Sequence, residues 1–78
     1  MTVQDLKEAL RHGGIREHAY DLECGERDEV YCLDAVQGGW RVYYRERGLR
    51  RDERFLTSED AATRYFLDLI TRDPTTRL

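Results

Sequence analysis

The spacing of apolar residues changes twice along this chain, and this constrains the fold more than any other feature of the sequence. Near the start, Val3, Leu6 and Leu10 recur at three- and four-residue intervals. The central residues alternate between apolar and polar, and the helical spacing then returns at Ala62, Tyr65, Phe66, Leu69 and Ile70. Intervals of three and four indicate an amphipathic helix, whereas alternation indicates a half-buried strand. The sequence therefore predicts an α+β fold with the order α-β-β-β-β-α.

Capping residues mark where both helices begin and end. Thr2 is a favoured N-cap with Asp5 three residues later, and Gly13-Gly14 is expected to end this helix after about three turns. The second helix is predicted to begin after Thr57 or Ser58 and to end before Pro74.

Glycines indicate the turns of the sheet, and we expect an antiparallel meander with both helices packed on one face. A turn at residues 25–28 would pair Cys24 with Glu29, Leu22 with Tyr31 and Tyr20 with Leu33. A two-residue turn at Gly38-Gly39 would pair Ala35 with Val42 and Leu33 with Tyr44. A fourth strand is expected at about residues 53–57, with Phe55 returning to the core.

Both predicted registers agree on which residues face the helices. The core face then holds Tyr20, Leu22, Cys24, Tyr31, Leu33, Ala35, Trp40, Val42 and Tyr44. The other face holds Asp21, Glu23, Val30, Cys32, Asp34, Val36, Arg41, Tyr43 and Arg45. This leaves Tyr43 as the single candidate for an exposed aromatic residue of the sheet. It also places Cys32 opposite Asp21 and away from Cys24, which argues against a disulfide.

Length and composition indicate one small domain. A chain of 78 residues buries only ~60% of the surface that its unfolded form exposes. No long apolar run is present, so we expect a cytoplasmic protein without a signal peptide or a membrane partner. Residues 75–78 are expected to fray. An edge strand would allow a weak dimer, but nothing in the sequence requires more than a monomer.

Charge is distributed unevenly along the chain. Residues 17–34 contain seven acids and one base, a net charge of −6, whereas residues 41–54 contain six bases and three acids, a net charge of +3. A concentrated acidic surface attracts basic partners and raises the rate of association.

The serine, acidic and cysteine residues of this chain are not spaced as they would be in a catalytic site. Ser58 is expected to cap a helix, Glu59 and Asp60 to favour the dipole of that helix, and Cys24 to be deactivated by neighbouring acids. The cysteines lack the close partners that zinc requires. We therefore expect no enzyme activity, no cofactor and no metal.

A nucleic-acid-binding domain is the alternative that element order favours. The order α-β-β-β-α occurs in double-stranded-RNA-binding domains, and six arginines lie between residues 41 and 54. Those domains place lysines at the start of the last helix, where this chain has Glu59 and Asp60. Carboxylates there would repel phosphate, so we expect nucleic acid not to be the partner.

Several segments together resemble a family of small bacterial immunity proteins associated with polymorphic toxin loci. They are DEVYC (28–32), WRVYYRERG (40–48), Phe55, SEDAA (58–62) and YF (65–66). The likeness spans about residues 20–70. This chain departs from the family pattern at Arg45, where serine is frequent, and at Ala61 and Thr63.

The resemblance implies a cytosolic antidote that binds and neutralises a toxin domain by covering its active site or substrate surface. The acidic segment favours a toxin with a basic cleft, and Arg45 is a candidate specificity position. We expect the partner surface to be formed by Asp21, Glu23, Glu26, Asp28, Glu29, Asp34, Tyr43, Arg45, Glu46 and Arg47.

Overall fold

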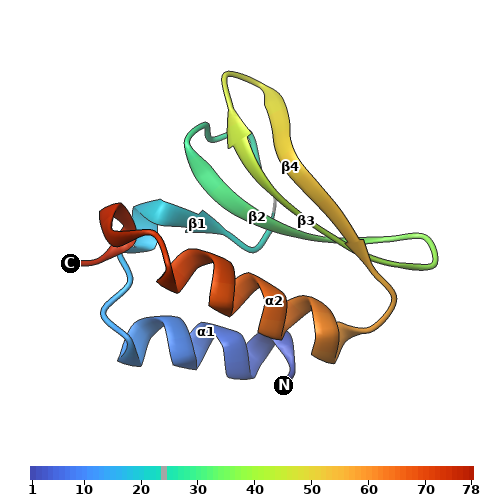
Figure 1. Cartoon of the computed structure of the whole chain (residues 1–78), viewed down its shortest axis with the longest axis horizontal. Coiled ribbons are helices and arrows are strands. Elements are labelled where there is room, and N and C mark those ends of the chain that lie inside the picture. The colour runs from blue at the N-terminus through green and yellow to red at the C-terminus, as the bar shows by residue number, and fades with distance from the viewer. Residues whose placement is uncertain (24) are drawn as a thin grey trace.

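A computed structural model describes residues 1–23 and 25–78 of the chain (Figure 1). Two helices and four strands follow the predicted order, with a short 3₁₀ turn after α1 and another after α2. The elements are α1 (Val3–His12), η1 (Glu17–Ala19), β1 (Tyr20–Asp21), β2 (Val30–Val36), β3 (Gly39–Glu46), β4 (Leu49–Leu56), α2 (Glu59–Thr71) and η2 (Pro74–Thr76). Both helices lie on the same side of the sheet, as predicted; α2 contacts β2, β3 and β4, and α1 lies alongside α2.

The helix ends follow the capping signals of the sequence. The Thr2 side chain accepts from the Asp5 amide and the Asp5 side chain accepts from the Thr2 amide, which completes a capping box. Gly13 ends α1, and Gly14 follows with φ of 72°. Ser58 is the N-cap of α2, since its hydroxyl accepts from the Ala61 amide. Within the part of the chain that the structure describes, no helix has the length and apolar character needed to cross a membrane.

The sheet has the order β1-β2-β3-β4, but its first pair differs from the prediction. β1 runs parallel to β2, with Tyr20 beside Tyr31 and Asp21 beside Cys32. The predicted antiparallel hairpin and its pairs of Tyr20 with Leu33 and Leu22 with Tyr31 are therefore wrong. A simple turn cannot join parallel neighbours, so residues after Asp21 reverse direction twice before β2. The predicted pair of Cys24 with Glu29, and the place of Cys24 relative to Cys32, lie outside the described residues.

The β2–β3 hairpin turns one residue earlier than the glycine pair suggests, which shifts the cross-strand pairing by two residues. Val36 pairs with Gly39, so the turn consists of Gln37 and Gly38, and the latter has φ of 83°. Ala35 consequently pairs with Trp40 and Leu33 with Val42, not with the predicted Val42 and Tyr44. Side chains alternate with a period of two, so this even shift preserves the predicted faces.

The β3–β4 hairpin is longer than predicted. Its two-residue turn consists of Arg47 and Gly48, with φ of 52° and 77°, as a type I′ turn requires. β4 therefore starts at Leu49 rather than near residue 53. A bulge between Val42 and Tyr44 adds one residue to β4, where Asp52 has φ of 54°.

The pairing of β3 with the last residues of β4 differs from the sequence prediction. Leu56 pairs with Trp40 and packs against the core, whereas Phe55 pairs with Arg41 and is 52% exposed on the opposite face. The expectation that Phe55 enters the core is wrong, because the register of this pair gives that place to Leu56.

The main core lies between the helices and the sheet. Leu6, Leu10, Leu33, Val42 and Phe66 are among its buried residues, and Trp40 and Tyr31 pack partly buried against it. The predicted core face is thus confirmed for these strand residues.

The outer face of the sheet carries a second, smaller apolar cluster of Val30, Cys32 and Tyr43. Tyr43 is only 4% exposed, so the expectation that it projects into solvent is wrong. Position on the outer face did not imply exposure, since Tyr43 packs with Val30 and Cys32 and the Arg50 guanidinium lies over its ring at 5.9 Å.

The last residues, for which fraying is expected, make hydrogen bonds to other parts of the chain. Thr76 is 3% exposed, and its hydroxyl donates to the Ile70 carbonyl at 2.9 Å. The Arg16 amide donates to the Thr76 carbonyl and the Leu78 amide to the Gly14 carbonyl, at 2.7 and 2.8 Å. These bonds attach the chain after α2 to the segment after α1.

Candidate partner-binding surface

The strongest candidate site is the acidic loop that joins β1 to β2, of which residues 22–23 and 25–29 are described. Asp21, at its base, is the residue that shapes it. The Asp21 carboxylate accepts from the Glu23 amide at 3.0 Å and from the Gly25 amide at 2.9 Å, and Arg27 lies 3.9 Å away. Its side chain is 12% exposed, so Asp21 organises the loop and presents little surface to a partner.

Arg45 attaches the acidic loop to the sheet. Its guanidinium donates to the Gly25 carbonyl at 2.7 Å and lies 3.7 Å from Asp28. The Glu29 amide in turn donates to the Arg45 carbonyl at 2.6 Å. Arg45 belongs to β3, two strands away from β1, so the loop extends past β2 to reach it. The predicted specificity residue is thus part of the support of the loop.

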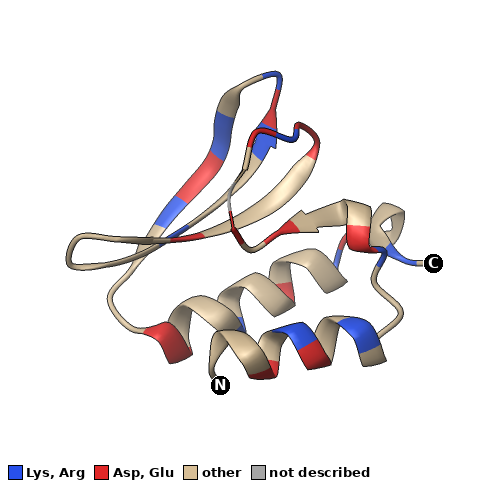
Figure 2. Ribbon diagram, turned by 180° about the vertical axis from the view of Figure 1, so that it is seen from behind, with Lys and Arg blue, Asp and Glu red and all other residues tan. Residues whose placement is uncertain are grey.

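Asp28 joins the loop to the β3–β4 turn. Its carboxylate accepts from the Gly48 amide at 2.8 Å. The structure therefore brings together the predicted acidic residues and the turn residue Arg47, although about 20 positions separate them in the sequence. Figure 2 shows the acidic and basic segments side by side at the end of the sheet away from the helices.

Four carboxylates of this loop are exposed to solvent, namely Glu23, Glu26, Asp28 and Glu29. Arg27 does not neutralise the tip, because its guanidinium is directed to the base of the loop, where it donates to the Tyr20 carbonyl at 2.7 Å. Like charges held this close in water create a negative potential that a cationic surface would relieve.

The other predicted site residues lie elsewhere and are already paired. Asp34 lies on the outer face, where the Arg41 guanidinium lies 3.5 Å from its carboxylate and 3.4 Å from the carboxylate of Glu53. Glu46 lies on the face toward the helices and pairs with Arg51 at 2.9 Å. Partly exposed pairs of this kind contribute only ~0–1 kcal/mol, so they are compatible with either a structural or a binding role.

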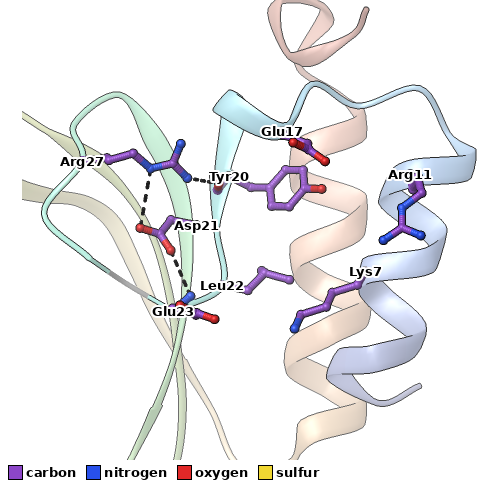
Figure 3. A pocket seen from close by; sticks show the side chains of 8 residues that line it. All are labelled: Lys7, Arg11, Glu17, Tyr20, Asp21, Leu22, Glu23 and Arg27. Carbon is purple, nitrogen blue, oxygen red and sulfur yellow. Dashed lines mark hydrogen bonds and ion pairs between the residues drawn. The ribbon is translucent and has the colours of Figure 1, made fainter.

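A groove between α1 and β1 borders the acidic loop (Figure 3). Its volume is about 250 Å³, and both Tyr20 and Leu22 contribute apolar surface to it. Lys7 and Arg11 project into it from α1, opposite Glu23 on the loop side. Charges of both signs surround an open groove, which suits contact with a protein surface more than capture of a single ion.

Of the residues considered for catalysis, Ser58 has the helix-capping role that the sequence predicts, whereas Cys24 lies outside the described residues. Ser58 caps α2 with its hydroxyl, and His12 and His18 are exposed at the end of α1 and in η1. Cys32 is buried in the outer cluster. No group of three or more metal-ligating side chains is found among residues 1–23 and 25–78.

The features of an RNA-binding surface are only partly present. Glu59 and Asp60 occupy the start of α2, where the Glu59 carboxylate accepts from the Val3 amide at 2.8 Å. Of the arginines on β4, Arg50 pairs with Glu53 at 3.1 Å, and Arg54 lies over the Tyr65 ring at 5.1 Å.

Comparison of the chain with known protein families, with curated proteins and with solved structures finds no match. The resemblance to immunity proteins therefore depends on the sequence segments named above.

Proposed function

We propose that this protein is an immunity-type binding protein, which neutralises a toxin domain by covering its active site or substrate surface. The observation that supports this most is the acidic loop, in which Glu23, Glu26 and Glu29 are exposed while the backbone is held at both ends. Near the start of the loop, the Asp21 carboxylate accepts a hydrogen bond from the Glu23 amide. Further along, Arg45 of β3 donates to the Gly25 carbonyl, and Asp28 accepts from the Gly48 amide in the β3–β4 turn. Loop ends that are already held before binding lose less conformational entropy when a partner docks.

The charge of the loop indicates the chemistry of the partner. Exposed Glu23, Glu26, Asp28 and Glu29 favour a basic cleft, as found in proteins that act on RNA, DNA or a nucleotide cofactor. Attraction between such surfaces mainly accelerates association. Inhibition then requires only that the loop occupies the cleft, and no chemical step.

Co-expression provides the test. The tagged chain is produced with the toxin domain encoded beside it, and complex formation and rescue of growth are measured. Glu23→Lys/Glu26→Lys should slow association by roughly tenfold or more, because it reverses charge at the centre of the surface. Glu8→Lys, at an exposed position of α1, is the matched control and should bind as the wild type does. A folded protein that neither binds nor rescues would overturn the proposal.

A double-stranded-RNA-binding role is a second candidate, favoured by the arrangement of α1, β2, β3, β4 and α2 with both helices on one face. The carboxylates of Glu59 and Asp60 at the start of α2 weigh against it. Salt-dependent retention of the protein on double-stranded RNA would support this role, and absence of retention at low salt would reject it.

A further inference from the structure

A second pocket lies beside the end of the acidic loop, between the helix-facing side of the sheet and η2. Its volume is about 250 Å³, and Tyr31, Tyr44, Glu29, Asp73 and Arg16 are among the residues that line it. Small-molecule sites generally have volumes of ~300–1,000 Å³, so this pocket is better matched to one side chain of a partner.

Two tyrosines form the aromatic wall of the pocket. Tyr31 and Tyr44 are paired across β2 and β3, and their ring centroids lie 4.8 Å apart at 61°. The Tyr31 hydroxyl donates to Asp73 at 2.8 Å. The Tyr44 hydroxyl, by contrast, makes no hydrogen bond to any described residue. It is therefore available to a group that enters the pocket.

The charged groups of the pocket are two carboxylates and one guanidinium. Glu29 is exposed at the rim, with φ of 59° and its amide bonded to β3, so its backbone is held at this position. Arg16 donates to the Thr75 carbonyl. Hydrogen bonds from Thr75 and Tyr31 lower the pKa of Asp73, and the charge of Arg16 lowers it slightly further. Burial raises the pKa of Tyr44, and the negative charges of Glu29, Glu46 and Asp73 raise it further. Two carboxylates, Glu29 and Asp73, against the single guanidinium of Arg16 leave this pocket with an excess of negative charge, which favours a cation.

We propose that this pocket receives an arginine side chain of the partner protein. The proposal rests on the proposed function for the existence of that basic partner. A guanidinium is planar and weakly hydrated, so it can stack against the Tyr44 ring while it donates to the Glu29 carboxylate. A lysine ammonium has neither the planar shape nor the paired donors.

Binding is tested first with the side chain alone. N-acetyl-arginine amide is titrated into the full chain, and the ring signals of Tyr31 and Tyr44 are followed by NMR. We expect saturable shifts with the arginine amide and none with the citrulline amide, which has nearly the same shape without the charge. Equal shifts with citrulline, or equal affinity for the lysine amide, would overturn the proposal.

Two variants locate the binding. Glu29→Gln removes the rim charge and should weaken binding of the arginine amide at least threefold. Glu26→Gln removes an exposed carboxylate of the same loop outside the pocket and should leave the affinity unchanged. Equal affinities of both variants would reject the pocket.

The partner complex separates this inference from the proposed function. If the toxin domain forms a complex and growth is rescued, but Glu29→Gln binds it as tightly as Glu26→Gln does, the pocket inference fails and the function stands. If no complex forms while arginine amide still binds at Tyr44, the function fails and the pocket remains.

Discussion

The ring of Phe55 occupies the space beside Gly39 that a side chain would need. A Cβ added to Gly39 would lie 2.7 Å from Cζ of Phe55 and 2.4 Å from the carbonyl oxygen of Leu56. Aromatic rings that cover a glycine on a neighbouring strand stabilise a sheet. The exposed Phe55 therefore has a structural role, and its exposure alone does not mark a binding site.

Gly39→Ala should destabilise the protein by about 1–3 kcal/mol, because the strand must shift to relieve the contact with the Leu56 carbonyl. Urea unfolding measures the change. The same substitution in a Phe55→Ala background should lose as much stability, since the closest atom belongs to the backbone. Recovery of stability in that background would show that the ring alone creates the conflict.

Tyr43→Ala should destabilise the protein more than Tyr44→Ala. Tyr43 is 4% exposed in the outer cluster, so its truncation is expected to cost ~3–5 kcal/mol, whereas Tyr44 is only partly buried. Thermal unfolding of both variants decides the order. A larger loss for Tyr44→Ala would mean that the outer cluster contributes little.

Arg47→Asn should raise stability by roughly 1 kcal/mol, because asparagine tolerates the positive φ that this turn position requires. The increase would appear in the midpoint of thermal unfolding. Arg51→Asn, at a β4 position without positive φ, serves as the control and should show no increase. An increase in the unfolding midpoint of both variants would show that the effect comes from the removal of positive charge.

Asp28→Ala should release the β3–β4 turn from the acidic loop. The Gly48 amide would lose a charged acceptor, an interaction of ~1.5–3 kcal/mol, so its hydrogen exchange should accelerate about tenfold or more. NMR measures this rate directly. Glu26→Ala should leave it unchanged, and an unchanged rate in Asp28→Ala itself would show that the turn is held by other contacts.

The Tyr31–Asp73 hydrogen bond should make stability depend on pH at both extremes. Hydrogen bonds from the Thr75 hydroxyl and then from Tyr31 lower the pKa of Asp73 below its usual 3.8. This stabilisation is therefore present above pH 4 and lost as pH falls through the folded-state value. Burial, followed by the bond to Asp73, raises the pKa of Tyr31 above 10.0, so the tyrosine contribution is lost as pH rises beyond that range.

Asp73→Asn provides the measurement for this bond. The difference in unfolding free energy between the wild type and Asp73→Asn should be largest near neutral pH and shrink in acid. A difference that stays constant from pH 7 to pH 2 would show that the charge of Asp73 is not what stabilises the contact.

Much of the fold follows from local patterns in the sequence. Thr2 and Ser58 cap the helices because their side chains bond to amides three residues away. The faces of β2 and β3 also follow, because alternation survives an even shift of register. The start of β4 could also have been predicted from the sequence, since Arg47-Gly48 precedes it and glycine is favoured in such turns.

Only part of the candidate site could be predicted from the sequence. The acidic character of residues 17–34 is visible in the composition. Which carboxylates remain exposed is not, because Asp21 folds back on its own loop and Glu46 pairs with Arg51. No pattern in the sequence indicated a role for Asp73, since its hydrogen-bond partner Tyr31 lies 42 positions away.

The sequence by itself determined the class of fold, the helix boundaries, the core face of β2 and β3 and the presence of an acidic segment. All four depend on the spacing and identity of residues close along the chain. Tertiary structure alone decided the parallel direction of β1, the burial of Tyr43, the attachment of the loop through Arg45 and the pocket between Tyr44 and Asp73. These depend on groups that are distant in sequence and meet only when the sheet, the loop and η2 pack together.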